Sequence, residues 1–185
     1  KLAQKNKDIT DSIRYAKRIQ TAILPEDKLF KSYLPNSFVY FRPKDIVSGD
    51  FYWIDKVGKK VVVAAIDCTG HGVPGAFMSL VGYNGMNKIV SEKKNTDAGE
   101  ILTKLDKNVA NALNQTDKEG IKDGMDMSLC VIDFEKQIVT YAGANNSLYL
   151  IKGDELIEVK ADKRAIGSYV GGDLQYNDHE ISFEA

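Results

Sequence analysis

Residues 48–72, with the sequence SGDFYWIDKVGKKVVVAAIDCTGHG, restrict the fold more than any other segment of the chain. Two apolar runs flank Gly58-Lys59, and glycine at the first central position of a two-residue turn favours a type II′ β-hairpin. The register that follows from this turn places Asp50 directly opposite Asp67 at the open end of the hairpin. Because opposed side chains on paired strands point to the same face, the sequence predicts that the two carboxylates lie together.

The hairpin is apolar on both of its faces. One face carries Tyr52, Ile54, Val61, Val63 and Ala65, and the other carries Phe51, Trp53, Val62, Ala64 and Ile66. A sheet that is covered on both sides lies between two layers of structure. One layer could be formed by helices and the other by a second sheet.

The two facing aspartates carry an energetic cost that the fold must offset. Like charges directly opposed on a sheet repel each other, and partial burial further disfavours the ionised form. The pair could share a proton, or it could hold a hard divalent cation such as Mg²⁺ or Mn²⁺, which prefers oxygen ligands. Alternatively, Asp67 already belongs to the following loop, where solvent or a salt bridge offsets its charge. His71 and His179 are the only histidines, so no cluster with zinc-type spacing competes with the cation hypothesis.

The segment after Asp67 has features that suit a bound ion. Gly70 and Gly72 allow the backbone to approach a ligand closely, and Pro74 is suited to the first turn of a helix. The N-terminal end of that helix would bring positive partial charge to the same place. Spacing alone leaves both the metal site and the structural alternative open.

The rest of the chain predicts two further helices and several strands besides an N-terminal helix. We expect helices over 2–24, 74–93 and 95–114. Strands outside the hairpin are expected over 36–42, 127–133, 137–143, 147–152, 155–160 and 179–183. This order of helix, strands, two helices and further strands is typical of the α+β class with a largely antiparallel sheet system.

Residues 1–24 are interpreted as a linker or signalling helix. Apolar and polar seam positions recur at Leu2, Asn6, Ile9, Ile13, Ala16, Gln20 and Ile23. This spacing is typical of a coiled coil and is compatible with a homodimer formed through residues 1–24. The alternative is a single amphipathic helix packed on its own domain. Because the chain begins inside this helix and without Met, we expect it to be a piece of a longer protein.

Composition excludes several classes of protein. The 185 residues include 25 Lys and Arg against 26 Asp and Glu, a balance that does not indicate a protein that binds nucleic acid or a membrane surface. No apolar run approaches the length of a bilayer span, and no signal peptide is visible. Two cysteines, Cys68 and Cys130, fit a reducing compartment, and we expect a cytoplasmic location.

Several motifs, in this order and spacing, resemble one known family. They are the helix SIRYAKRIQTAILP, then SGDFYW, IDCTGHGVPGAFM, DGMDMSLCVID, YAGANNSLYLI and DKRAIG. The chain from about residue 12 to its end resembles the SpoIIE/RsbU branch of the metal-dependent serine/threonine protein phosphatases, the PPM superfamily. The resemblance implies an α/β/β/α sandwich of two antiparallel sheets between helical layers, which agrees with a hairpin that is apolar on both faces.

The resemblance also implies a site and a reaction. Asp50 and Asp67 match the family's metal-binding aspartates, and the backbone carbonyl of Cys68 matches a further ligand. Two Mn²⁺ or Mg²⁺ ions would activate a water molecule that attacks phosphoserine or phosphothreonine without a phosphoenzyme. The implied substrate is a small phosphorylated regulatory protein, such as an anti-sigma-factor antagonist, and an upstream sensor domain in the same polypeptide would control the output.

The chain also departs from the family pattern. Members continue with an SDG motif and a later DD or DN motif that supply metal carboxylates, whereas this chain stops at Ala185. Residues 25–185 are therefore expected to be a phosphatase domain that lacks its C-terminal part and to be a poor enzyme alone. Asp123 and Asp126 match a different part of the pattern, so they are not counted as replacements. The alternative function is a non-catalytic partner-binding module, a pseudophosphatase.

Three other residues have both a chemical and a structural interpretation. A cysteine-phosphatase role for Cys68 is disfavoured because Pro74 occupies the position of the phosphate-binding Arg in that chemistry. His71 could donate a proton to the leaving oxygen, or it could simply hydrogen-bond the turn. Arg42 could meet the substrate phosphate, or it could be an ordinary surface residue.

Overall fold

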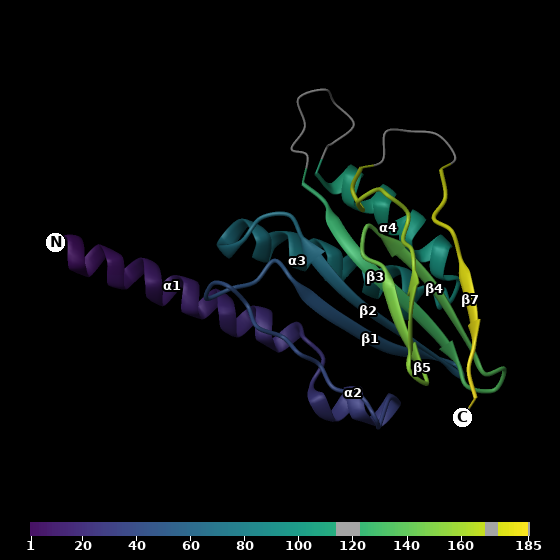
Figure 1. Ribbon diagram of the computed structural model, residues 1–185. Helices are drawn as coiled ribbons and strands as arrows, with labels where there is room; N and C mark the ends of the chain where they lie inside the picture. The colour runs from purple at the N-terminus through teal and green to yellow at the C-terminus, as the bar shows by residue number, and fades with distance from the viewer. Residues whose placement is uncertain (114–122, 169–173, 185) are drawn as a thin grey trace.

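The computed structural model describes residues 1–113, 123–168 and 174–184, and an antiparallel sheet forms its centre (Figure 1). Its five strands are β1 (Phe51–Val57), β2 (Lys60–Cys68), β3 (Met125–Asp133), β4 (Ile138–Ala144) and β7 (His179–Ser182), in the spatial order β1-β2-β3-β4-β7. Strands β5 (Leu148–Lys152) and β6 (Glu155–Val159) form a separate two-stranded sheet. The predicted α+β class with antiparallel sheets and helices is confirmed.

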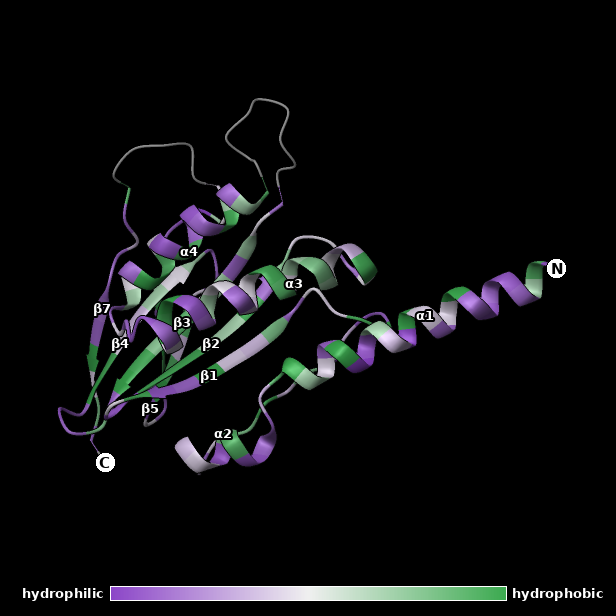
Figure 2. Cartoon of the chain, turned by 180° about the vertical axis from the view of Figure 1, so that it is seen from behind, coloured by the Kyte–Doolittle hydropathy of each residue, from purple (hydrophilic) through white to green (hydrophobic). Residues whose placement is uncertain are grey.

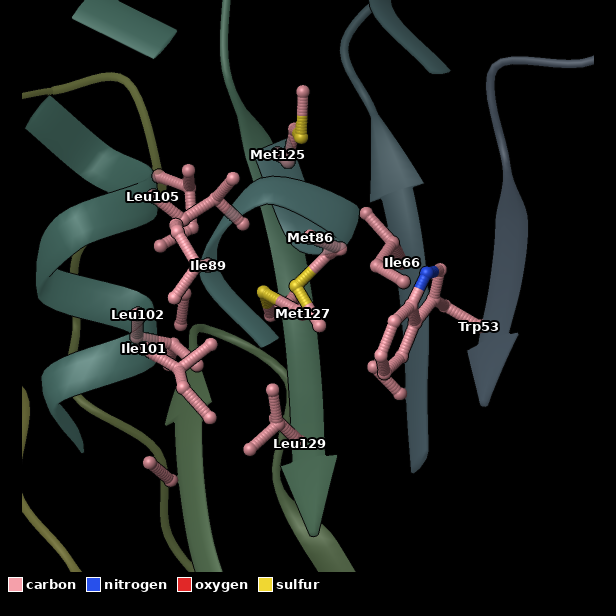
Figure 3. Packing of buried hydrophobic residues seen from close by; sticks show 14 of the residues in the cluster. Trp53, Ile66, Met86, Ile89, Ile101, Leu102, Leu105, Met125, Met127 and Leu129 are labelled. Atoms are coloured by element: carbon pink, nitrogen blue, oxygen red, sulfur yellow. The ribbon is translucent and has the colours of Figure 1, made fainter. Parts of the chain in front are cut away.

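Helices cover one face of the five-stranded sheet. Helix α3 (Gly72–Met86) continues into a π-helix, η1 (Asn87–Glu92), and α4 (Ala98–Ala112) follows. Figure 2 shows α3 and α4 on the same side of the sheet. Their side chains close the main hydrophobic core with residues of β1, β2 and β3, as Figure 3 shows for Trp53, Ile66, Met86, Leu102 and Met127. This core fixes the hairpin face that carries Phe51 and Trp53.

The opposite face of the hairpin is covered only in part. A short helix, α2 (Asp27–Tyr33), places Phe30 against Ile54 and Val61, and these three side chains form a second buried cluster. Ala65 and Asp67, further along the same face of β2, are exposed. The second sheet expected over this face is represented among the described residues by β5 and β6 alone.

The strand predicted over residues 36–42 is wrong. No strand among the described residues pairs with this segment, so it belongs to neither sheet. The alternating aromatic pattern that suggested a strand still sorts the side chains: Phe38 and Tyr40 are exposed, whereas Phe41 packs edge-on against Tyr52. A strand needs a hydrogen-bonded neighbour as well as an apolar period.

Helix α1 (Leu2–Ile23) extends away from the sheet, with the N-terminus at its far end (Figure 1). Leu2 and Ile9 are 74% and 58% exposed, whereas Gln20, near the other end, is 8% exposed. Only the C-terminal part of the helix therefore rests on the domain. Within the residues that the structure describes, no helix is both long and apolar enough to cross a membrane.

The Gln20 side chain joins α1 to two other segments. Its Nε2 donates to the Ser48 carbonyl oxygen (2.6 Å) and to Ser79 Oγ of α3 (2.9 Å), while its Oε1 accepts from the Ser48 N–H (2.9 Å). All three residues are buried. The helix is thus fastened to the loop that leads into β1, two residues before Asp50.

Candidate metal centre

Asp50 and Asp67 lie at the open end of the β1–β2 hairpin, as the sequence predicts. The observed pairing runs from Val57 opposite Lys60 to Phe51 opposite Ile66, and the two aspartates follow at its end. Partial burial of the Asp50 carboxyl group, its hydrogen bond with Asp67 and the Asp67 charge raise the pKa of Asp50 from 3.8 to about 6. The close contact between two acids favours either a shared proton or a bound cation.

Glycines hold the loop that carries Asp50 against the turn that follows Asp67. A Cβ atom at Gly49 would lie 2.7 Å from the Gly70 carbonyl oxygen and 3.1 Å from the Cys68 carbonyl oxygen. At Gly75, in the first turn of α3, a Cβ atom would lie 2.6 Å from the same Gly70 oxygen. Any side chain at these positions would force the loops apart. The Cys68 carbonyl therefore lies where the loop before Asp50 meets the turn after Asp67.

The Cys68 side chain points away from the aspartates and into the core. The residue is 3% exposed, and burial, together with the Asp50 and Asp67 charges, raises the pKa of its thiol well above the usual range. A thiol that stays protonated is a poor nucleophile. The structure thus agrees with the sequence argument against a cysteine phosphatase.

His71 is the residue before α3 and is bound to a side chain that sequence reasoning did not single out. Its Nδ1 lies 2.8 Å from Oδ2 of Asp45, in the loop before β1. The pair links the loop before β1 to the turn after Asp67, and most of the imidazole ring stays exposed. Nothing in the local sequence relates positions 45 and 71, because their contact depends on how the two loops pack.

A third acid, Asp126, lies beside Asp67. Strand β3 pairs Asp126 directly with Asp67, so Asp126 lies on the side of Asp67 away from β1. The Asp126 carboxylate accepts a hydrogen bond from Asn145 Nδ2 at 2.8 Å. In the part of the chain that the structure describes, no group of three or more His, Cys, Asp and Glu side chains could hold a metal ion. Asp126 is consequently a neighbour of the aspartate pair and is not counted as a ligand.

A cavity of about 600 Å³ opens on the sheet face opposite α3 and α4. Asp50 and Asp67 line it together with Arg42, Ser128 and Asn146, and its remaining wall is mainly aromatic and aliphatic. The structure therefore brings Arg42, one of the sequence candidates, to the same cavity as the aspartates. Asn146 was not singled out, since only the β3–β4 pairing carries it there.

The donor set suits a hard divalent cation. Two adjacent carboxylates and nearby backbone carbonyls are the oxygen ligands that Mg²⁺ and Mn²⁺ prefer. Burial raises the pKa of Asp50 most, and the hydrogen bond and charge of Asp67 raise it further; a cation would offset that charge. Asp50, Asp67 and the Cys68 carbonyl are the oxygen donors at this place that would contribute to the coordination of such an ion.

The site consists of a hairpin with two paired aspartates, which a glycine turn joins to a helix that packs on an antiparallel sheet. Together with the similarity to known proteins, this arrangement identifies a phosphatase-type domain. The family model for stage II sporulation protein E (SpoIIE) matches residues 58–185. The chain belongs to the SpoIIE family, among the PPM phosphatases of SpoIIE/RsbU type. The matched region includes Asp67 and begins after Asp50. A comparison with curated proteins gave no match.

Solved structures support the same assignment. The PP2C domain of SiaA from Pseudomonas aeruginosa is 32% identical, with a TM-score of 0.86 over 98% of this chain and 70% of that one. The PP2C phosphatase domain of SpoIIE from Bacillus subtilis, with a fragment of its regulatory domain, is 20% identical, with a TM-score of 0.60 over 75% of this chain and 39% of that one. RsbX in complex with magnesium is 17% identical, with a TM-score of 0.52 over 75% and 62% of the two chains. The last two similarities concern the fold.

Proposed function

We propose that this chain is the output domain of a metal-dependent protein serine/threonine phosphatase in a signalling protein. The observation that carries the proposal is the Asp50–Asp67 pair, which lines a cavity large enough for a phosphorylated side chain. Family membership agrees with this chemistry. The substrate would be a phosphoserine or phosphothreonine on a small regulatory protein, such as an anti-sigma-factor antagonist.

Asp50, Asp67 and the Cys68 carbonyl would hold Mn²⁺ or Mg²⁺, two ions in the complete domain. RsbX, a structural neighbour, has been solved in complex with magnesium. Bound ions would supply an activated water molecule and stabilise charge on the phosphoryl oxygens. Arg42 lines the same cavity and would contact the phosphate through its guanidinium group. His71 would donate a proton to the seryl or threonyl oxygen as that oxygen leaves phosphorus.

The remaining elements fit a regulated cytoplasmic signalling protein. Helix α1 extends away from the domain and is fastened near Asp50, so an upstream sensor in the same polypeptide could act through it. A homodimer through residues 1–24 would use the exposed Leu2 and Ile9. The SpoIIE structure, one of the structural neighbours, contains a fragment of a regulatory domain together with its PP2C phosphatase domain.

The test measures hydrolysis of a phosphoserine protein by the intact protein with millimolar Mn²⁺. The Asp67→Asn variant is assayed in parallel with wild type. We expect wild-type turnover that requires Mn²⁺ and a loss of about a hundredfold or more in the variant, the range found when charge stabilisation at a reacting group is removed. Asp154→Asn, in the exposed β5–β6 turn, is the matched control and should leave turnover unchanged. Equal turnover by Asp67→Asn and wild type would refute the assignment.

A non-catalytic partner-binding module is the alternative, and one observation favours it. The described residues contain too few clustered acids for a complete metal site. A pseudophosphatase would bind the phosphorylated regulator without hydrolysing it. Pull-down of that regulator by the intact protein, without phosphate release at any Mn²⁺ concentration, would select this alternative.

A further inference from the structure

We propose that Asp45 is a positioning residue that fixes the His71 imidazole with its proton on Nδ1, so that Nε2 is the nitrogen that exchanges a proton with substrate. This inference rests on the proposed phosphatase function. The Asp45 carboxylate is the group within hydrogen-bond distance of Nδ1, at 2.8 Å. A carboxylate can only accept, so Nδ1 must be the donor.

His71 lies next to the candidate metal ligands in the chain but outside the residues that line the cavity of Asp50 and Asp67, so it would act on the part of a substrate that extends beyond that cavity. His71 immediately precedes α3 and comes four residues after Asp67 in the turn that carries the candidate metal ligands. The His71 side chain is 70% exposed although Nδ1 is bound, so the rest of the ring is open to a large substrate. The Asp45 carboxylate also lies against Gly72, where an added Cβ would be 3.5 Å from Oδ2. The positive φ of Gly72 (63°) lets the chain turn sharply between the imidazole and α3.

A purely structural role would be minor. An exposed ion pair between two loops stabilises a fold only slightly, because solvent screens the charges. The loops already meet through the backbone contacts of Gly49, Gly70 and Gly75. What Asp45 adds is control over which ring nitrogen carries the proton, since the hydrogen bond at one nitrogen sets the state of the other.

The proton transfer balances. Protonated His71 gives the Nε2 proton to the seryl oxygen as the bond from that oxygen to phosphorus breaks. The attacking water oxygen forms the new bond to phosphorus and releases its own proton to solvent. His71 is left neutral, with its remaining proton on Nδ1 held by Asp45, and it regains the Nε2 proton from solvent.

The first test reads the proton position directly and does not require activity. Long-range ¹H–¹⁵N NMR distinguishes protonated from unprotonated ring nitrogens, and the chain has only two histidines, so His179 serves as an internal reference. In the neutral ring of wild type we expect Nδ1 to be protonated in His71. Asp45→Ala should move that proton to Nε2, and Asp45→Glu should keep it on Nδ1. An unchanged His71 tautomer in Asp45→Ala would overturn the proposal.

The second test uses two substrates of the Mn²⁺-loaded intact protein, because a proton donor matters only for a poor leaving group. With a phosphoserine protein as substrate, the turnover rate should fall about 100-fold or more in His71→Asn and about tenfold in Asp45→Ala. Losses of this size lie within the usual contribution of general acid catalysis. On p-nitrophenyl phosphate, whose leaving group needs no proton, both variants should stay within about threefold of wild type. Asp45→Glu should recover part of the phosphoserine activity.

The remaining outcomes separate the proposed role of Asp45 from the proposed phosphatase function. Equal losses on both substrates in Asp45→Ala would mean that Asp45 only supports the loops, and no loss on either would mean that it does not act on catalysis. Wild type without activity would reject the phosphatase function, while the NMR experiment would still decide whether Asp45 sets the His71 proton.

Discussion

Replacing Gln20 tests whether α1 is coupled to the candidate metal centre. The Gln20 amide makes three buried hydrogen bonds, two to the Ser48 backbone and one to Ser79. Gln20→Ala would leave the Ser48 N–H and C=O without their protein partners. Each buried polar group that loses its partner costs about 1–3 kcal/mol, so we expect a total destabilisation of about 2–4 kcal/mol, water entry offsetting part of the loss. For a chain of this size, that is a fall in melting temperature of about 5–15 °C.

The chain offers a matched control on the same helix. Gln4 is also a glutamine of α1, but its amide donates to the exposed Asp8, one turn away. Gln4→Ala should therefore change stability by less than about 0.5 kcal/mol. Because Ser48 lies two residues before Asp50, Gln20→Ala should also weaken Mn²⁺ binding, whereas Gln4→Ala should not.

Thermal denaturation and calorimetric Mn²⁺ titration of wild type and both variants provide the measurements. Equal melting temperatures for Gln20→Ala and Gln4→Ala would refute the hydrogen-bond argument. A destabilised Gln20→Ala that binds Mn²⁺ as tightly as wild type would refute the coupling alone, and α1 would then be fastened to the domain without influence on the site.

Three further predictions concern the aspartate pair and α1. In Asp67→Asn, the metal-free protein should melt at a higher temperature than wild type because the repulsion of Asp50 is relieved, while calorimetry should show weaker Mn²⁺ binding. The folded-state pKa of Asp50 is about 6 and the ordinary value is 3.8, so the stability that Asp50 contributes is complete below pH 3.8 and is lost as pH rises through about 6. Denaturant titrations of the metal-free protein should show this decline in the free energy of unfolding, and Asp50→Asn should abolish the decline. Light scattering should show a dimer that becomes a monomer when residues 1–24 are deleted, and a monomeric intact protein would contradict the proposed seam.

The hairpin could be predicted because all of its information is local. A glycine turn sets the register, and the register then sets which residues face each other. The proximity of Asp50 and Asp67 was therefore predicted from the sequence alone, and the observed pairing of β1 with β2 agrees with the predicted register along its full length. The helices α1, α3 and α4 were also predicted, α1 from its seven-residue spacing and α3 from Pro74 in its first turn, with ends that differ by a few residues. The short helix α2 was missed because seven residues give too few turns for a helical period to stand out.

The surroundings of the aspartates could not be predicted, because they depend on contacts between distant segments. Asp126 reaches Asp67 only through the pairing of β2 with β3, whose strands are joined by a long excursion through α3 and α4. Asp45 reaches His71 only because glycines let two loops pack closely, and Gln20 reaches Ser48 across 28 residues. Segment 36–42 shows the converse: its local pattern is that of a strand, yet a strand forms only where a neighbour supplies the hydrogen bonds.

The short loop from Asp45 to Asp50 connects the contact of α1 with both parts of the proposed active site. Asp45, the first residue of the loop, contacts the candidate proton donor His71, and Ser48 is hydrogen-bonded to Gln20 of α1. Asp50, the last residue, is a candidate metal ligand. A displacement of α1 that broke the contacts of Gln20 with Ser48 would act on both the metal ligand and the histidine, since the loop between them is short. Within a loop of six residues, a change at Ser48 has few bonds over which to relax before it reaches either end. This arrangement explains physically how a helix that projects from the domain could control a site on the sheet without contacting the substrate.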